Sequence, residues 1–542
     1  MRTTTGQRPL TSARPGQGPA RRRAALAGVL SAGLTLGVAQ LVAVAVSPGS
    51  APLVAVGDAF VDRTPAWLKD AAIAAFGTQD KVALFVGMGL VLAALAAGAG
   101  LLARSRPAAG VAAVVALGAV GAVAAWTRPD AVITSPLPSL VGAAAGVVAL
   151  LALVRRIEVP ATATPSPAGV GGAANPAEAD PDPGVELDRR RFLGAAVVVT
   201  AAAALSAAAG AVAGSVGRAA GAARDLIRLP APSRPAPPLP PGVQSTTPGV
   251  VDFVTDVADF YRIDTALTVP QVDPATWTLR IHGLVQNEIL LTFDELLELE
   301  MVESYVTLVC VSNPVGGSLI GNAKWLGHPL RTLLERAVPL PEADMVLSTS
   351  VDGFTASTPL GVLTDSRDAV LAVAMNDAPL PAAHGFPVRM VVPGLYGYVS
   401  ATKWVVDLEV TRFADRTAYW TDRGWSAEGP VKTSSRIEVP RPGVPVPPGP
   451  VAVGGTAWAQ HTGITGVEVQ VDDGPWLTAQ LADEASIDTW RQWSFTWDAT
   501  PGAHTLRSRA TDATGAVQTG TVTGVVPDGA TGWHAVEVAV QS

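Results

Sequence analysis

The only cysteine of this 542-residue chain, Cys310, lies where a strand-like apolar run gives way to a loop. Residues 305–309 are rich in β-branched and aromatic residues, whereas residues 312–317 contain Ser, Asn, Pro and two Gly, which favour turns. A single cysteine cannot form an intrachain disulfide. The thiol is therefore either a small buried hydrophobic group or a reactive group presented to a ligand.

Six segments, one of which contains this cysteine, form an ordered set that is more specific than any one motif. They are TWTLRIHGLVQNEILLTFDEL (276–296), TLVCVSN (307–313), GNAKWLGHPLRTLL (321–334), VDGFTASTPL (351–360), LAVAMNDAPLPAAHGFPVRMVVPGLYGYVSATKW (371–404) and VKTSSRIEVP (431–440). Together they resemble the catalytic domain of the sulfite oxidase family of molybdopterin enzymes. The resemblance covers residues 250–542, because the segment after residue 437 is similar to the family's immunoglobulin-like dimerisation domain.

This resemblance implies a molybdenum–molybdopterin cofactor. Cys310 would be the protein's thiolate ligand to the metal, beside the two sulfurs of the pterin dithiolene. Soft sulfur donors suit such a metal, and a coordinating thiol is deprotonated. The HGFPVR motif implies that His384 and Arg389 hydrogen-bond the cofactor, and arginine suits phosphate because its planar fork donates two parallel bonds. The SATKW motif implies that Lys403 contacts the pterin phosphate region.

Four further residues are implied as cofactor contacts. Ser400 and Thr402 flank Lys403 in the same motif, and the segment DFYRID (259–264) contributes Tyr261 and Arg262. Taken alone, a residue of any of these types is more often part of a surface ion pair or a core aromatic than a cofactor contact.

The segment after Cys310, where the family binds its substrate, departs from the family pattern. In this family the oxidative reaction transfers an oxygen atom to sulfite, and the cofactor then returns two electrons one at a time. Sulfite oxidases commonly carry arginines just after the metal cysteine, whereas here Val311–Pro314 follows. Arg262 and Arg491 are predicted as catalytic cations for an anionic substrate, with Lys324 as a further candidate.

Five apolar segments upstream predict membrane helices, since a hydrocarbon core of about 30 Å requires roughly 20 helical residues. They are Ala24–Val46, Val82–Ala103, Ala108–Trp126, Leu137–Val154 and Phe192–Ala213. Arginine clusters lie at residues 21–23, 104–106, 155–156 and 189–191. Five alternating spans would place every cluster on the cytoplasmic side of the plasma membrane and everything after residue 214 outside.

The run before the fifth segment, DRRRFLGAAVVV (188–199), resembles a twin-arginine export signal, which carries folded, cofactor-loaded proteins. An ordinary positive-inside anchor is the alternative interpretation. No histidine precedes His282, so we predict no haem in the membrane region. There is also no Cys-x-x-Cys-His motif, so electrons would pass to or from a separate partner, a cytochrome or a membrane redox protein.

The expected fold is an α-helical membrane anchor, then an α+β molybdopterin domain, then an all-β sandwich. The expected boundaries are 1–23 (basic cytoplasmic N-terminus), 24–156 (four-helix membrane region), 157–191 (cytoplasmic loop), 192–213 (fifth helix), 214–249 (Pro-rich linker), 250–437 (oxidoreductase domain) and 438–542 (immunoglobulin-like domain). The Pro-rich stretch 228–249 would be a spacer that reaches about 70 Å when extended.

Local patterns support the two exported domains. Residues 277–285 alternate as a strand, and residues 292–300 and 328–337 are helical in pattern, the first of them opening on a Thr292–Glu295 capping box. A hairpin turn is predicted at Asp473-Gly474. Further strands are predicted at residues 493–498, 504–512 and 519–526.

Three functions remain open at this level. The first is oxidation of sulfite or a related small sulfur compound, and the second is reduction of sulfoxides, such as oxidised methionine, with the same cofactor. The immunoglobulin-like domain, which implies a possible homodimer, favours the first, since the reductase-like relatives generally lack it. The third is a non-enzymatic cell-surface binding protein. A net charge of −8 without a basic tail disfavours nucleic acid as a partner.

Overall fold

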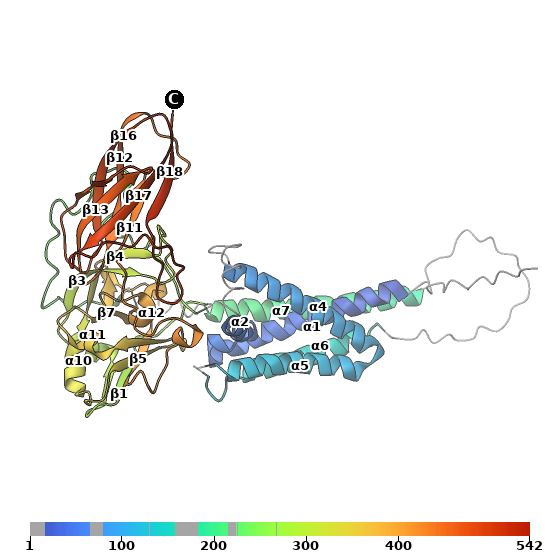
Figure 1. Ribbon diagram of the computed structural model, residues 1–542. Helices are drawn as coiled ribbons and strands as arrows, with labels where there is room; N and C mark the ends of the chain where they lie inside the picture. The colour runs from blue at the N-terminus through green and yellow to red at the C-terminus, as the bar shows by residue number, and fades with distance from the viewer. Residues whose placement is uncertain are drawn as a thin grey trace, which may run out of the picture. The chain divides into compact units, whose positions relative to one another are not determined.

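The computed structural model describes residues 17–64, 80–128, 131–157, 183–214, 224, 226–266 and 268–541. The chain divides into two compact units, residues 1–218 and 219–542, each of which is described by itself (Figure 1).

The first unit is helical, as its apolar segments predict. Its elements are α1 (Gln17–Val46), η1 (Pro48–Ser50), α2 (Pro52–Arg63), α4 (Asp80–Ser105), α5 (Pro107–Trp126), α6 (Leu137–Arg155) and α7 (Pro183–Gly214). Helices α1, α4, α5 and α6 are long and apolar enough to cross a bilayer. In the described residues the apolar part of α7 is shorter, Phe192–Ala208, so the fifth predicted span does not reach the length of the other four. The short helix α2 was not predicted.

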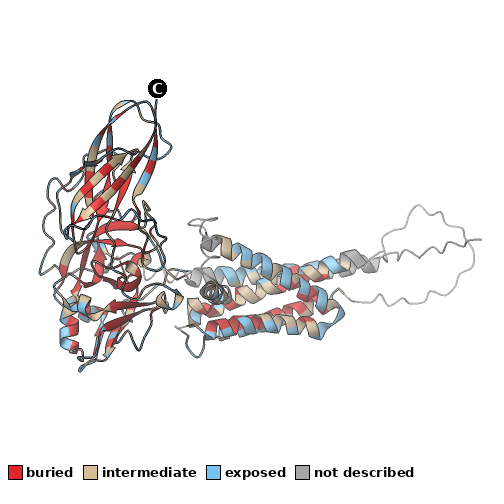
Figure 2. Ribbon diagram, in the orientation of Figure 1, coloured by how far each residue is buried: buried red, intermediate tan, exposed pale blue. Residues whose placement is uncertain are grey.

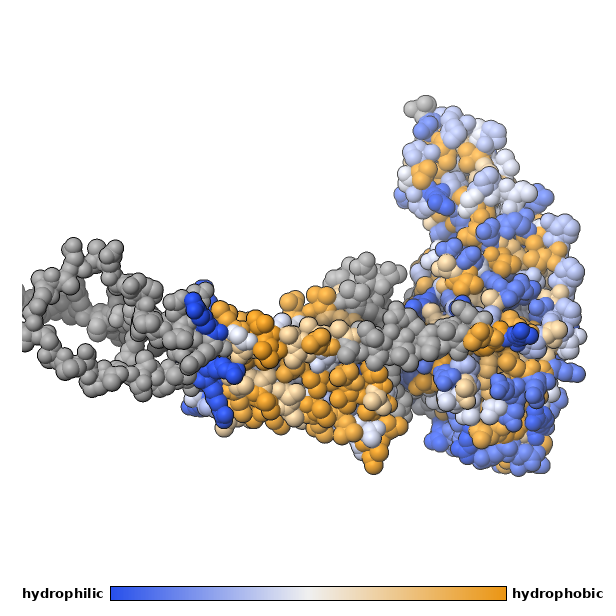
Figure 3. Space-filling model, turned by 180° about the vertical axis from the view of Figure 1, so that it is seen from behind, coloured by the Kyte–Doolittle hydropathy of each residue, from blue (hydrophilic) through white to orange (hydrophobic). Residues whose placement is uncertain are grey.

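These helices pack through small residues. A Cβ on Gly28 of α1 would lie 1.9 Å from the backbone oxygen of Ala96 in α4, and one on Gly100 would lie 2.1 Å from that of Ala24. Only glycine permits this approach, which is the usual means of close helix packing where no water drives association. Outward-facing residues such as Leu90 and Val148 are apolar, and Figure 3 shows a largely apolar surface over the helices.

The second unit begins with an α+β region that contains one mixed sheet and one antiparallel sheet. One has the order β2-β1-β10-β5-β6, where β1 runs parallel to β10. Its strands are β1 (Thr278–Gly283), β2 (Ile289–Thr292), β5 (Met345–Ser350), β6 (Thr355–Pro359) and β10 (Val405–Thr411). The other has the order β3-β4-β7-β8, with β9 beside β7. Its strands are β3 (Val302–Val309), β4 (Ile320–Pro329), β7 (Val370–Met375), β8 (Ala378–Pro379) and β9 (Arg389–Val391).

Short helices connect these strands, and the sequence predicts the first two of them, α9 (Phe293–Glu298) and α10 (Leu330–Ala337). The others are α11 (Leu360–Thr364) and α12 (Gly397–Ser400), with 3-10 turns η4 (Ala382–His384) and η5 (Thr421–Arg423). The predicted capping box is confirmed: the Thr292 hydroxyl accepts the Glu295 amide, and the Glu295 carboxylate accepts the Thr292 amide. Helix α10 falls inside the predicted run 328–337.

The Pro-rich stretch 228–249 is extended but is not a free spacer, contrary to the prediction. The Ser233 amide donates to the Met301 carbonyl at 2.8 Å, and Arg234 forms a bridge with Val302 at the edge of β3. Further along, the Ser245 amide donates to the Gln492 side chain. The described part of this stretch therefore lies along the second unit, because its backbone groups find partners there.

The rest of the second unit is all-β, with two four-stranded sheets, β11-β12-β16-β15 and β14-β13-β17-β18. The strands are β11 (Ser434–Val439), β12 (Gly449–Trp458), β13 (Ile464–Val471), β14 (Trp476–Thr478), β15 (Gln480–Leu481), β16 (Arg491–Ala499), β17 (Gly502–Asp512) and β18 (His534–Val540). Buried residues of both sheets, including Trp493, Val467 and Val538, form one core (Figure 2). We refer to residues 434–541 as the sandwich.

Two details of the sandwich differ from expectation. The predicted strand 519–526 is irregular and has only a single bridge, Thr523 to Thr531. Its Gly520 and Gly524 weaken strand pairing, and Val522 points into solvent with 82% exposure. The expected boundary at residue 437 falls inside β11, which pairs with β12. The hairpin at Asp473-Gly474 is confirmed, since β13 pairs with β14 across it.

Candidate active site

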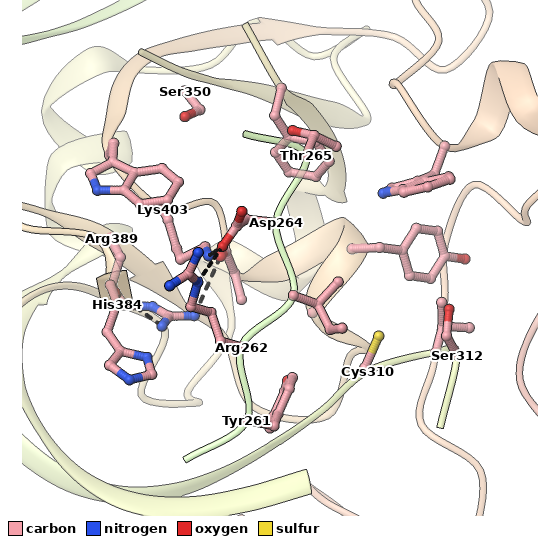
Figure 4. Close-up of a pocket in the computed structure, with 18 of the residues that line it drawn as sticks. Tyr261, Arg262, Asp264, Thr265, Cys310, Ser312, Ser350, His384, Arg389 and Lys403 are labelled. Carbon is pink, nitrogen blue, oxygen red and sulfur yellow. Dashed lines mark hydrogen bonds and ion pairs between the residues drawn. The ribbon is translucent and has the colours of Figure 1, made fainter. Parts of the chain in front are cut away.

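A cavity of about 850 Å³, counted with its open mouth, lies in the α+β region and is lined by five separate segments (Figure 4). The segments are 260–265, 310–312, 350–354, 384–404 and 420–425. Six of the predicted site residues line it: Tyr261, Arg262, Cys310, His384, Arg389 and Lys403. Residues separated by more than 140 positions therefore share one space.

Strand β3 delivers Cys310 to this cavity. The last pair of the β3–β4 ladder is Val309 with Ile320, so Cys310 opens the connecting loop. Its amide donates to the Leu319 carbonyl at 2.9 Å, and its own carbonyl accepts the Asn313 amide at 3.0 Å. The residue is 8% exposed, and burial raises the pKa of its thiol, while hydrogen bonds from Ser312 act in the opposite direction. Figure 4 places the sulfur on the cavity wall close to Ser312.

Two cations in the cavity share one acid. The Asp264 carboxylate accepts from Arg262 Nε at 2.9 Å and from Lys403 Nζ at 3.0 Å, and its side chain is only 3% exposed. Burial lowers the pKa of Lys403 to about 8, and Asp264 opposes that shift. The ammonium also lies 4.6 Å from the centre of the Trp404 ring, a favourable cation–π contact.

Arg389 is the most deeply buried cation of the cavity, with 5% exposure. Its guanidinium donates only to backbone carbonyls of His384, Met390 and Ala401, at 3.2 to 3.4 Å. Among the described residues no carboxylate pairs with it, and burial lowers its pKa to about 10. A buried guanidinium without a counter-ion is costly, so this group is suited to an anion that enters the cavity.

His384 lies beside these cations at the end of η4. Burial lowers the pKa of its imidazole to about 4, and the charges of Arg389 and Lys403 act in the same direction. The ring packs edge-on against Phe260 with a 5.7 Å separation of centres. His384 is therefore neutral near pH 7 and can both donate and accept hydrogen bonds.

An aromatic wall, defined here as Phe354, Tyr398, Trp420 and Trp425, closes another part of the cavity. Tyr398 contacts Trp425 with ring centres 5.9 Å apart, and Trp425 contacts Trp420 at 6.2 Å. The Tyr398 hydroxyl donates to the Ser426 carbonyl at 2.6 Å, which fixes that ring. These rings present apolar surface to whatever enters the cavity.

The geometry can be compared with known proteins. A sequence family described as oxidoreductase molybdopterin binding domain matches residues 266–420. Sulfite oxidase of Gallus gallus is 29% identical over 278 residues, which cover 42% of this chain and 60% of that protein. The uncharacterized oxidoreductase YuiH of Bacillus subtilis (strain 168) is 32% identical over 157 residues, which cover 29% of this chain and 76% of that protein. The chain belongs to the sulfite oxidase family of molybdopterin-dependent oxidoreductases.

The extent of these matches differs among relatives. The chain spans 60% or less of the sulfite oxidases that it matches in chicken and Drosophila melanogaster. Among solved structures, the sulfane dehydrogenase SoxCD of Paracoccus pantotrophus aligns with 26% identity and a TM-score of 0.42, over 47% of this chain and 71% of that one. Membership of an oxidoreductase family argues against the non-enzymatic alternative.

The side chains of the cavity fit the cofactor that the family implies. Molybdopterin brings a phosphate and a metal that takes sulfur ligands, and the cavity offers three cations against two carboxylates, Asp264 and Asp352, together with a single thiol. Arg389 shows this fit most clearly. Its buried guanidinium has the donors for a phosphate, and no carboxylate pairs with it among the described residues. The thiol and the cations of the cavity therefore match molybdopterin, the cofactor that the family implies.

Three predicted site residues do not line the cavity. The Ser400 hydroxyl donates to the Tyr396 carbonyl at 2.9 Å, and Thr402 exchanges a 2.7 Å hydrogen bond with Ser348. Both are fully buried, so their side chains hold the loop rather than face the cavity. Arg491 donates to the carbonyls of Ala482 and Ile464 within the sandwich, at 2.8 Å each. Lys324 likewise pairs with Asp377, outside the cavity.

Some residues of the cavity were not predicted from the sequence. Asp264 follows Arg262 by two positions and turns out to pair two cations of the cavity. Ser312 lies two residues after Cys310 and hydrogen-bonds its sulfur. The aromatic residues of 416–426 form a dense cluster in the sequence, and that density was the available signal for the aromatic wall.

Proposed function

We propose that this protein is an exported, membrane-anchored molybdenum oxidoreductase that oxidises sulfite, or a related small sulfur compound, by oxygen-atom transfer. One observation carries the proposal: a single cavity joins the chain's sole thiol to a cationic group that has an excess of positive charge. The sulfite oxidases among the relatives support sulfite as the first candidate substrate.

Each residue has a definite part in this proposal. Cys310 holds the metal through its sulfur, and Arg389, Lys403 and His384 hold the pterin and its phosphate. When bound, the cofactor supplies the oxygen-atom transfer and the two-electron chemistry. Tyr261 and Arg262 complete the cavity beside the sulfur and the cations, and Arg262 attracts an anionic substrate because it is half exposed at the mouth.

The net reaction balances without any further cofactor in the chain. Sulfite and water give sulfate, two protons and two electrons. The electrons leave one at a time to a separate partner, which we propose to be a cytochrome or a membrane redox protein. The aromatic wall keeps bulk water from the sulfur end, which strengthens the electrostatic interactions inside the cavity.

Reduction of sulfoxides is the second candidate, and the aromatic wall favours it. Arg262 and Lys403 pair with Asp264, and the guanidinium of Arg389 donates to backbone carbonyls. A neutral sulfoxide with an organic substituent would pack against Trp420 and Trp425 and needs no cation at the sulfur. Reduction of a sulfoxide to a sulfide takes up two electrons and two protons and releases water.

Location and assembly belong to the same proposal. We propose that the four long apolar helices, with α7 as a fifth crossing, anchor the protein in the plasma membrane and leave the second unit outside the cell. The twin-arginine-like run before α7 would serve export. The sandwich would have the immunoglobulin-like form and mediate a homodimer.

Two paired assays test the proposed function. Full-length protein made in a molybdopterin-competent host should contain about one molybdenum per chain, and Cys310→Ser should lose turnover while it keeps the wild-type circular dichroism spectrum. Sulfite-dependent ferricyanide reduction would support the first candidate, and oxidation of reduced viologen by methionine sulfoxide would support the second. Protein without metal would contradict both.

A further inference from the structure

The connection between β3 and β4, residues Cys310–Leu319, is held from two sides. We call it the cysteine loop. Internally, the Cys310 amide donates to the Leu319 carbonyl at 2.9 Å, and the Asn313 side chain accepts the Leu319 amide at 2.8 Å. The remaining contacts come from the sandwich, which is more than a hundred residues away in the chain.

Arg436 of β11 makes the first of these contacts. Its guanidinium donates to the Gly317 carbonyl at 2.8 Å and to the Glu438 carboxylate. Both side chains of this ion pair are buried, with exposures of 9% and 7%. The carboxylate also accepts the Thr456 hydroxyl and the Val251 amide. Glu438 therefore fixes the direction of the guanidinium, and the guanidinium fixes the loop carbonyl.

His534 of β18 makes the second contact. A Cβ on Gly316 would lie 2.1 Å from Cδ2 of this ring, so the loop backbone rests directly on the imidazole. Gly316 has φ +76°, a conformation that glycine adopts without strain. The Ile437 amide donates to Nδ1 of His534 at 3.0 Å, so the backbone next to Arg436 holds the ring in place.

The strand that leads to the cysteine is anchored in the same way. The Thr307 amide donates to the Asp488 carbonyl at 3.0 Å, and the Thr307 hydroxyl accepts the Trp490 amide at 2.8 Å. The side chain of Gln460 donates to the Thr307 carbonyl. The sandwich thus contacts the chain both before and after Cys310, while none of these residues lines the cavity.

We propose that Arg436 and His534 are positioning residues, through which the sandwich fixes the cysteine loop and thereby sets where the Cys310 sulfur meets its ligand. This assignment deepens the proposed function, since it rests on Cys310 as the metal ligand. It gives the sandwich a role inside each chain that is independent of any dimer. Neither residue lines the cavity.

The sole cysteine makes the first test direct, because any alkylation of the chain reports on Cys310 alone. Full-length protein is produced in a host that cannot make molybdopterin and is held in detergent micelles with iodoacetamide. Arg436→Met combined with Glu438→Met removes the buried pair together, so that no lone charge destabilises the fold. Arg509→Met combined with Glu468→Met is the matched control, since that sandwich ion pair (2.8 Å) does not contact the loop.

We expect alkylation in the Arg436 and Glu438 double variant to be about tenfold faster, the size of one lost hydrogen bond from a charged donor. Arg436→Lys should restore much of the protection, because it keeps a cation that can reach either oxygen. His534→Ala should give a smaller increase, about threefold, since packing is lost but the guanidinium contact remains. The control should match the wild type in rate, whatever its change in melting temperature.

A second readout uses the holoenzyme. The Mo(V) electron paramagnetic resonance signal should change in the Arg436 and Glu438 double variant and not in the control, with kcat lower by about tenfold and KM little affected. Equal alkylation rates in the double variant and the control would overturn the positioning role, as would an unchanged spectrum. Absence of molybdenum from the wild type would instead contradict the proposed function. The alkylation test uses protein made without the cofactor, so its result on the cysteine loop would not depend on that outcome.

Discussion

At the scale of single residues, Cys310 and Arg389 have complementary surroundings. The thiol lies at the end of a strand with hydrogen bonds from Ser312, whereas the guanidinium is buried over the Trp325 ring, 5.0 Å from its centre, and makes only long hydrogen bonds, all to backbone carbonyls. A carbonyl is a weaker partner for a cation than a carboxylate or a phosphate. Arg389 therefore has binding capacity that the protein itself does not use.

This difference predicts the effect of replacing Arg389. Arg389→Met should retain the cofactor about 10- to 100-fold less well, the range for loss of a hydrogen-bonded charge, while Arg389→Lys keeps part of the affinity. The measurement is molybdenum and pterin content of purified protein after dialysis.

Arg331→Met is the matched control, because Arg331 also donates only to backbone carbonyls, those of Asp365 and Arg367, outside the cavity. Equal loss of cofactor from both variants would show that the effect is structural rather than local to the cavity.

At the scale of elements, local patterns were predictable and long-range partners were not. The capping box at Thr292 and the hairpin at Asp473-Gly474 depend on residues within a few positions of each other, and both are confirmed. The family motifs located six cavity residues. The side chains of Ser400 and Thr402 do not line the cavity because they bond to Tyr396 and Ser348, and that of Arg491 does not because it donates to Ala482 and Ile464 in the sandwich. The strand expected at 519–526 failed since alternation does not reveal whether a partner strand exists.

His534 of strand β18 makes the stability of the fold depend on pH. Burial, and then the charge of Arg436, lowers the pKa of His534 to about 4, below its ordinary value of 6.5. The unfolded chain therefore binds a proton before the folded one as the pH falls, so this group reduces stability from about pH 6.5 down to about pH 4. The Ile437 amide donates to Nδ1, and that bond is lost on protonation.

His534→Asn keeps an acceptor for that amide but does not titrate. Melting temperatures followed by tryptophan fluorescence between pH 7.5 and pH 4.5 should fall less steeply in this variant than in the wild type. Some slope should remain, because burial also lowers the pKa of His384 to about 4. Identical slopes in the two proteins would exclude His534 as a source of the acid sensitivity.

At the scale of the whole molecule, the number of crossings decides where the second unit functions. Helices α1, α4, α5 and α6 have the length and composition of spans, and an even number would return the chain to the side on which it began. Four crossings place the arginine clusters at residues 21–23, 155–156 and 189–191 on the same side, the cytoplasmic one by the positive-inside rule, and a crossing after the last cluster would then put the second unit on the other side. In the proposed topology, α7 therefore decides on which side of the membrane the second unit lies.

Single-cysteine labelling tests this crossing, because Cys310→Ser removes the only native thiol. In that background, Ala503→Cys places a thiol at an exposed position of the sandwich, and Ser166→Cys places one between the fourth and fifth apolar segments. A membrane-impermeant maleimide applied to intact cells should label the first and spare the second, with both labelled after permeabilisation. Labelling of Ser166→Cys alone in intact cells would show the orientation opposite to the proposed one. Labelling of neither before permeabilisation would mean that α7 does not cross, since only a fifth crossing separates the two positions.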